Sequence, residues 1–248
     1  RFSSRIRQLV SNCVGPNLNY YITDSMEDGK PQATHSEGSF RMNRRTAGID
    51  LGSVSVKVAL VERGNVVHAA YRRHYGRPGE VLAILLSELE GLEGMPVAVT
   101  GSGSVLVSDL IGAKPVNEVV ALSSAVTELL PEARSVIEMG GQDSKLLLFR
   151  RDGGRTLFDD FAMNSVCAAG TGSFLDQQAT RLGLDPEAMG REAELCESPP
   201  RIAGRCSVFA KSDMIHLQQI GTPVRDIVAG LCFAVARNFK SSIASGRD

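Results

Sequence analysis

Regular alternation of hydrophobic and polar residues begins at Thr46 and predicts a run of strands. Three strands are expected first, over residues 46–51, 55–62 and 66–74. Apolar residues at helical spacing then predict a helix that opens at Pro78, and residues 96–100 predict a short buried strand. The first hundred residues are therefore dominated by strands.

A second set of elements follows, and it begins again with a strand. The expected elements are a helix over 117–130, a strand over 134–139, a hairpin of 145–150 and 155–160, and helices over about 170–182, 207–220 and 222–244. For the last helix we expect Thr222 as N-cap and Pro223 at the first helical position.

This order of elements indicates a mixed α/β fold with two similar lobes, because a glycine–aspartate junction recurs at the end of a strand. The expected lobes are residues 46–133 and 134–248, the second of them incomplete. Residues 1–45 lack periodicity and are interpreted as an extension of unknown role. The chain stops directly after a long helix, so we expect a carboxy-terminal piece to be missing.

Composition narrows the class of protein. The 248 residues are 43% hydrophobic, as in a folded globular protein, and the net charge of −1 excludes a large basic surface for nucleic acid. No stretch approaches the ~20 apolar residues of a membrane span. The amino terminus lacks the pattern of a secretory signal, so we expect a cytoplasmic protein without membrane partners.

The turn after the first strand has the residues of a phosphate-binding loop. Gly52 allows close approach of the backbone to a ligand, and the Ser53 hydroxyl can face phosphate oxygens. Asp50 is anionic and is expected to bind Mg²⁺, directly or through water. Lys57 can neutralise phosphate charge. A single such loop is weak evidence, because tight turns often look alike.

A second loop repeats the design and strengthens the interpretation. Gly140 and Gly141 end a strand, and Gln142 and Asp143 follow them. We expect Gln142 to orient an attacking water, and Asp143 to hold a metal-bound water or act as a base. Neither the G-x-x-x-x-G-K-[ST] nor the G-x-G-x-x-G pattern is present, so P-loop and dinucleotide-binding folds are excluded.

The cysteines suggest a further site. The chain has five, and their odd number, with no C-x-x-C, argues against a disulfide framework or a simple zinc site. Cys13, Cys196 and Cys232 are interpreted as inert thiols. Cys167 and Cys206 each precede a predicted helix, whose N-terminus stabilises a thiolate or an anionic cluster. The residues alone leave open a metal site built from two chains, a zinc site, or two unrelated buried thiols.

At this point the sequence resembles a known family. The matching segments are GIDLGSVSVK (48–57), TGSG (100–103), EMGGQDSK (138–145), FAMNSVCAAGTGSFLD (161–176) and CSVFAKSD (206–213). They are similar to the ATP-dependent activators of 2-hydroxyacyl-CoA dehydratases and to the ATPase subunits of benzoyl-CoA reductases. The family belongs to the superfamily of acetate and sugar kinases, heat-shock ATPases and actin. The resemblance therefore implies an actin-like, ribonuclease H-like fold.

The resemblance also implies cofactors and partners. ATP and Mg²⁺ would bind at the phosphate loops, and one [4Fe–4S] cluster would bridge a homodimer through Cys167 and Cys206 of each subunit. Gly170, Thr171 and Gly172 would belong to the cofactor-binding segment. A ferredoxin or flavodoxin would donate the electron, and a CoA-thioester dehydratase or reductase component would accept it.

Several positions depart from the family pattern. Val54 replaces a hydroxyl residue, and Ser102 lies in a loop that usually carries an aromatic residue and an arginine. Ser165 and Val166 replace a charged pair before Cys167, and Lys211 replaces an acid. The carboxy-terminal segment that normally holds adenosine is not present in the chain. Two alternatives therefore stay open: a small-molecule kinase of the same superfamily, which needs no cluster, and a scaffold subunit that does not hydrolyse ATP.

Overall fold

The computed structural model describes residues 45–113, 115–164 and 168–246, so nearly all of the predicted extension lies outside it. These residues form two compact units. The first contains the described residues up to Ala133 together with Gly153–Thr156, and the second contains Arg134–Asp152 and the described residues from Leu157 onward. Within the described part of the chain, no helix is long and apolar enough to cross a membrane.

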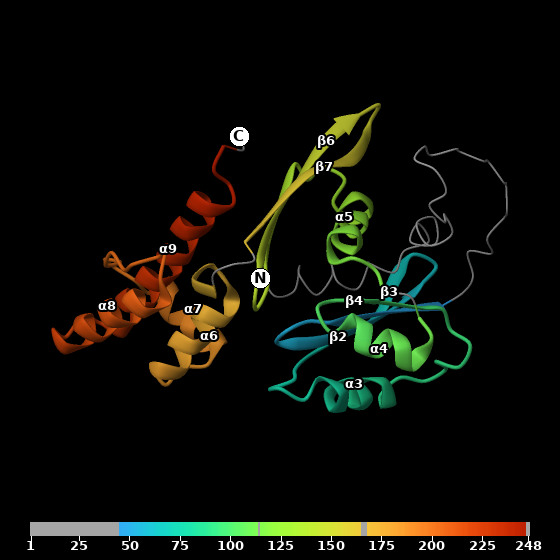
Figure 1. The fold of residues 1–248 in the computed structure, drawn as a ribbon, viewed down its shortest axis with the longest axis horizontal. Coiled ribbons are helices and arrows are strands. Elements are labelled where there is room, and N and C mark those ends of the chain that lie inside the picture. Colours follow the sequence, from blue (N-terminus) through green and yellow to red (C-terminus); the bar gives the residue numbers. More distant parts are fainter. Residues whose placement is uncertain (1–44, 114, 165–167, 247–248) are drawn as a thin grey trace. The chain divides into compact units, whose positions relative to one another are not determined.

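A four-stranded sheet organises the first unit (Figure 1). Its strands are β1 (Arg45–Leu51), β2 (Ser55–Glu62), β3 (Asn65–Arg73) and β4 (Val97–Thr100), in the order β3-β2-β1-β4. The first three pair antiparallel, whereas β4 runs parallel to β1. All four predicted strands are confirmed to within a residue or two at each end. The parallel pairing brings the carboxyl ends of β1 and β4 together, at Asp50 and Thr100.

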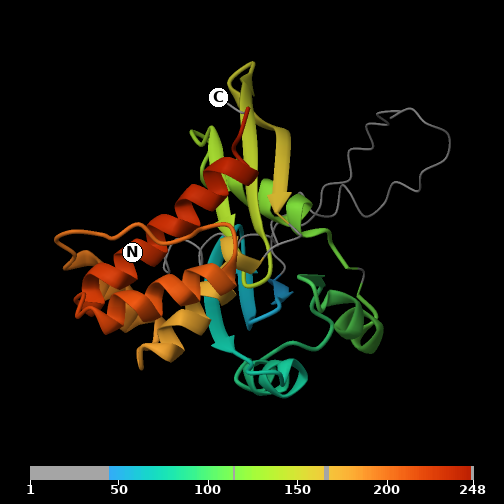
Figure 2. The same ribbon diagram turned by 60° about the vertical axis from the view of Figure 1, so that its left-hand side comes forward.

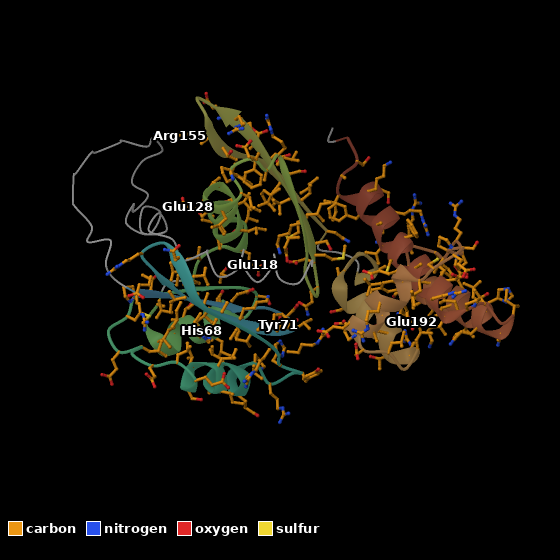
Figure 3. All side chains as sticks on the ribbon, turned by 180° about the vertical axis from the view of Figure 1, so that it is seen from behind. His68, Tyr71, Glu118, Glu128, Arg155 and Glu192 are labelled. Carbon is orange, nitrogen blue, oxygen red and sulfur yellow. The ribbon has the colours of Figure 1, made fainter. Side chains whose placement is uncertain are left out.

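The described part of this unit also contains the helices α3 (Pro78–Ser87), α4 (Ser104–Ile111) and α5 (Glu118–Leu129). Residues of the sheet and of α3 form its core, among them Ile49, Val58, Leu85 and Val99. At the start of α5 the Asn117 side chain accepts the Val119 N–H at 2.9 Å. Figure 3 shows Glu118 and Glu128 at opposite ends of that helix. The sequence interpretation missed α4, which is short, apolar and rich in valine, a residue that favours strands.

The second unit begins with a three-stranded sheet of order β5-β6-β7. Its strands are β5 (Ser135–Met139), β6 (Ser144–Asp152) and β7 (Arg155–Asn164), and β5 pairs antiparallel with β6. Gly153 and Gly154 connect β6 to β7 with φ angles of 54° and 81°, a left-handed conformation that glycine adopts at little cost. The predicted hairpin is confirmed, and both of its strands are longer than expected.

Helices make up the rest of the second unit (Figure 2): η2 (Ala168–Gly170), α6 (Gly172–Arg181), α7 (Pro186–Glu194), α8 (Ser207–Gln219) and α9 (Val224–Ser242). Apolar side chains of α9 form the centre of this core and pack with Phe174 of α6 and Met214 of α8. The sequence interpretation missed α7, although Asp185 caps its start by accepting the Ala188 N–H and Pro186 follows at its first position.

The start of α9 corrects one prediction. Pro223, and not Thr222, is the N-cap, because its ψ of 139° is extended while its carbonyl accepts the N–H groups of Asp226 and Ile227. Proline can hold this position because a helix leaves its first amides without internal acceptors. The observed elements otherwise confirm the mixed α/β class.

Candidate functional site

The first phosphate loop lies between β1 and β2 and has a charged pair at its base. Asp50 and Lys57 are direct cross-strand partners, and 2.6 Å separates Lys57 Nζ from Asp50 Oδ2. The Gly52 N–H donates to the Ser55 carbonyl at 3.0 Å, which closes the turn. A Cβ on Gly52 would lie only 3.4 Å from Lys57 Nζ, so glycine permits this close packing. Lys57 thus stands beside the predicted metal-binding carboxylate.

His74 supports the backbone of this loop. Its N–H donates to the Val54 carbonyl at 3.1 Å, and its ring Nε2 lies 3.2 Å from the Gly52 carbonyl oxygen. Since ring Nδ1 accepts the Gly76 N–H, Nε2 carries the proton and donates to Gly52. Ser53, between these two anchored residues, is partly exposed. No pattern in the sequence pointed to this role of His74.

The TGSG segment packs against the first loop. Gly101 has a φ of 98°, and a Cβ there would lie 2.5 Å from both Asp50 Oδ1 and the Leu51 carbonyl oxygen. The Gly103 N–H donates to that same carbonyl at 2.8 Å. The two glycines therefore let this turn approach the end of β1 closely.

A buried hydroxyl completes this half of the site. Thr100 is paired in register with Asp50, and its Oγ1 is buried without a hydrogen-bond partner in the part of the chain that the structure describes. An unpaired buried hydroxyl is uncommon. Together, the Asp50 carboxylate and the Thr100 hydroxyl offer hard oxygen donors that suit a hydrated Mg²⁺ ion. The described residues contain no group of three or more His, Cys, Asp or Glu side chains that would hold a metal alone.

The second phosphate loop has a lysine between two carboxylates. Lys145 Nζ lies 2.8 Å from Glu138 Oε2 and 2.9 Å from Asp143 Oδ1. The lysine side chain is only 4% exposed, whereas about a third of each carboxylate side chain is exposed. A Cβ on Gly140 would lie 2.8 Å from Asp143 Oδ1, so this glycine too permits a close contact. Gln142, at the tip of the loop, is exposed to solvent.

The two loops correspond residue by residue. Asp50 and Lys57 are seven residues apart and paired across their strands, and so are Glu138 and Lys145. The residue that repeats Asp50 is therefore Glu138, whereas Asp143 is an additional carboxylate of the second loop. The sequence interpretation missed Glu138. The spacing acid-x-Gly-x₄-Lys, present at residues 50–57 and again at 138–145, would have identified it.

The predicted cofactor segment after Cys167 lies against the second loop. The Gly172 N–H donates to the Gly140 carbonyl at 2.8 Å, and the Ser173 N–H donates to the Gly141 carbonyl at 3.1 Å. These two amides lie in the first turn of α6, where we expected free N–H groups to face a cofactor. They donate instead to carbonyl groups of the phosphate loop. Thr171, between the two predicted glycines, is fully buried. Cys167 itself lies outside the described residues.

Cys206 occupies the start of α8, as predicted. It is the N-cap residue, with extended φ and ψ of −142° and 123°, and its side chain does not cap the helix. Cys206 is partly exposed, and its thiol has no helix-capping role. A Cβ on the nearby Gly204 would lie 2.6 Å from the Ala234 carbonyl oxygen, so this segment packs directly on α9. Lys211, one turn into α8, is exposed.

Two other cysteines have environments that favour the protonated thiol. Burial raises the pKa of the Cys196 thiol, and its contact with the Asp226 carboxylate raises it further. Burial also raises the pKa of Cys232. Since a metal binds the thiolate, these two positions suit a metal poorly, whereas Cys206 stands at the start of a helix.

Two glycine loops that each follow a strand and carry an acid–lysine pair are typical of the actin-like ATPases. The chain belongs to the BadF/BadG/BcrA/BcrD ATPase family, whose family model matches residues 47–247. This confirms the resemblance seen in the sequence.

Individual relatives agree with this assignment. The 2-hydroxyisocaproyl-CoA dehydratase activator of Clostridioides difficile is 32% identical over 80% of this chain and 75% of its own length. A structure of the activator of that dehydratase from Clostridium difficile, solved with bound ADPNP, superposes with a TM-score of 0.70 at 33% identity, over 79% of this chain and 74% of that one. The structure of component A of the (R)-2-hydroxyglutaryl-CoA dehydratase of Acidaminococcus fermentans superposes with a TM-score of 0.73 at 27% identity, over 83% of this chain and 80% of that one. The actin-like fold is thereby confirmed.

Proposed function

We propose that this chain is an ATP-hydrolysing activator that transfers a low-potential electron to a CoA-thioester dehydratase or reductase. The observation that carries the proposal is the direct hydrogen bonding between the second phosphate loop and the segment that follows Cys167. A nucleotide loop joined to a cysteine-bearing segment suits a protein in which nucleotide state and cysteine chemistry are linked. Relatives with the same family membership are named as activators of such dehydratases.

The first loop would hold the metal and the phosphates. Mg²⁺ would bind through water to the Asp50 carboxylate and the Thr100 hydroxyl, whose residues are paired at the ends of β1 and β4. Amides and the hydroxyl of Ser53 would contact phosphate oxygens, with Val54 contributing only its backbone. Lys57 would lower the cost of placing phosphate charge beside Asp50.

The second loop would perform hydrolysis. A water oriented by the exposed Gln142 side chain would attack the γ-phosphorus of ATP, and the bond from that phosphorus to the β–γ bridging oxygen would break. Asp143 would accept the proton that the water loses. Lys145 keeps this carboxylate in place, because the ammonium bridges it to Glu138. Gly140 and Gly141 would bring the backbone close to the phosphates.

The cysteines would hold the redox centre. Cys206 fits as a ligand because its thiol is accessible at a helix start. Together with Cys167, it would give two thiolates per subunit, so a homodimer would supply the four that a [4Fe–4S] cluster needs. When bound, this cluster supplies one-electron chemistry at low potential. The proposed donor is a ferredoxin or flavodoxin, and the proposed acceptor is the dehydratase or reductase component.

Anaerobic purification tests the proposal. We expect about four irons and four acid-labile sulfides per dimer, together with ATP hydrolysis. Both Cys167→Ser and Cys206→Ser should abolish iron binding, whereas the matched control Cys232→Ser should retain it. Colourless protein that phosphorylates a small molecule would instead favour the kinase alternative, and protein lacking both cluster and hydrolysis would favour the scaffold.

A further inference from the structure

Ser144 joins the second phosphate loop to the segment that follows Cys167. It is the first residue of β6 and is fully buried. Its Oγ donates to the Gly170 carbonyl at 2.7 Å. Two backbone hydrogen bonds lie next to this one, from Gly172 and Ser173 to the carbonyls of the loop. Three hydrogen bonds therefore connect the second loop and the first residue of β6 to the end of η2 and the start of α6.

The first loop shows which of these connections is special. There the Gly103 N–H donates to the Leu51 carbonyl at 2.8 Å, as the Gly172 N–H donates to the second loop. A backbone bond from a G-x-G turn is thus common to both units. The residue that corresponds to Ser144 is Val56, one position before the lysine in each case, and Val56 has no hydroxyl. Among the described residues, this side-chain connection is present at the second loop and absent from the corresponding position of the first.

Gly170, which receives this hydrogen bond, is closely surrounded. A Cβ there would lie 2.9 Å from Asn238 Nδ2 and 3.0 Å from Asn164 Nδ2. Asn164, the last residue of β7, therefore lies against Gly170. A shift of the Gly170 carbonyl would affect both the start of α6 and the end of β7 at Asn164.

We propose that Ser144 is a positioning residue that couples the nucleotide state of the second loop to the cysteine segment. The proposal rests on the proposed function, because it requires that a nucleotide binds at this loop. When a nucleotide moves residues 140–143, the Ser144 hydroxyl transmits the movement to Gly170. The backbone bonds from Gly172 and Ser173, of which the first unit has a single counterpart from Gly103, do not provide this side-chain connection.

Hydrogen exchange with and without ADP, read by mass spectrometry on the full chain, tests this coupling and needs no bound cluster. In the wild type, ADP should slow exchange at residues 140–145 and also at 168–173, the second by about five-fold or more. In Ser144→Ala, ADP should still slow exchange at residues 140–145. At residues 168–173 the ratio of the exchange rate without ADP to the rate with ADP should fall to about one. A merely structural role would change exchange equally with and without ADP.

Ser108→Ala is the matched control. Ser108 is also buried and donates to a backbone carbonyl, that of Ser104, at 2.7 Å in the first unit. This variant should keep both protections. If ADP protects residues 140–145 but not 168–173 in the wild type, the coupling is overturned and the proposed function still stands. This outcome decides the question even if Ser144→Ala does not fold. Retained protection at 168–173 in Ser144→Ala would also overturn it, and failure of ADP to bind would overturn both proposals.

Discussion

The two phosphate loops share one plan and differ in what surrounds the lysine. In the first, Lys57 meets a single carboxylate and keeps 21% of its side chain exposed. In the second, Lys145 meets two carboxylates and is almost fully buried. A lysine is buried in this way only when its charge is compensated. The second loop is therefore the more rigidly determined of the two.

This difference suggests a division of roles. Among the described residues, the Thr100 hydroxyl of the first loop has no partner and the Asp50 carboxylate has one ionic partner, which leaves oxygen donors for a metal ion. The second loop has its charges compensated internally and is hydrogen-bonded to the following segment through Gly140, Gly141 and Ser144. The first loop is suited to bind a nucleotide with its metal ion, and the second loop is suited to bind the nucleotide and to transmit its movement to the start of α6.

Replacing each of the two lysines by methionine should give the largest difference in stability between the loops. Lys145→Met leaves Glu138 and Asp143 facing each other without a counter-charge, and we expect a loss of about 2–3 kcal/mol, because solvent screens these partly exposed carboxylates. Lys57→Met leaves one carboxylate, whose side chain is 15% exposed, without its counter-charge, and should cost less, about 1–2 kcal/mol. Urea unfolding at pH 7 measures both. Equal losses would contradict the distinction between the loops.

Glycine replacements compare the two G-x-G turns. Gly101→Ala forces a Cβ into a left-handed residue, 2.5 Å from backbone and from Asp50, and should cost about 1–3 kcal/mol and most of the nucleotide affinity. Gly172→Ala meets the Gly140 carbonyl oxygen at 3.0 Å, which a small shift relieves, so its effect should be smaller.

Gly190→Ala is the control for these variants, because a Cβ on this glycine of α7 meets no atom within 4 Å. It should stabilise the chain by about 0.5–1 kcal/mol through helix propensity. Thermal unfolding and the binding of a fluorescent nucleotide together measure the series. A larger loss of affinity from Gly172→Ala than from Gly101→Ala would reverse the assignment of the metal to the first loop.

Much of this architecture could be predicted from the sequence, because strands with alternating polarity and glycine turns carry strong local signals. Residues 55–62 were predicted with their observed ends. The charged pairs at Asp50 and Glu138 depend on strand register, which aligns residues seven positions apart and is fixed by the folded sheet. The seven-residue spacing is visible in the sequence, but only the strand register shows that the acid and the lysine are paired across the strands.

Other features could not have been predicted because they are purely tertiary. The contact of His74 with the Gly52 carbonyl joins residues 22 positions apart, and the bond from Ser144 to Gly170 spans 26 positions. Serine and histidine are common residues, and no local pattern marks those that support a loop. Helix α4 was missed for a different reason: its valines favour a strand, and packing in the first unit overrides that preference.

The unpaired hydroxyl of the first loop gives a smaller and more specific effect. Thr100→Val removes it with little change in volume, and because the oxygen has no partner among the described residues, stability should stay equal or rise slightly. Affinity for ATP measured with Mg²⁺ should fall about three- to ten-fold, while affinity without Mg²⁺ stays the same. Titration of a fluorescent ATP analogue with and without Mg²⁺ measures this. An equal loss in both conditions would exclude a metal role for Thr100.

The smallest effect concerns a carboxylate of the second unit outside the loops. A hydrogen bond from the Glu197 N–H lowers the pKa of Asp226 below its ordinary value of 3.8, and the Cys196 thiol, the Ser198 N–H and Arg225 act in the same direction. A lowered pKa stabilises the folded chain above that ordinary value, and the contribution is lost as the pH falls through the folded value.

Asp226→Asn should therefore be less stable than the wild type at pH 7, and the difference should disappear under more acidic conditions, below the lowered pKa of Asp226. Urea unfolding at a series of pH values measures it, and nucleotide binding at pH 7 should stay unchanged, because Asp226 contacts residues 196–198 and not the phosphate loop. Weaker nucleotide binding in this variant would mean that the second loop depends on the stability of its whole unit. The losses seen in Lys145→Met would then no longer report on the loop alone.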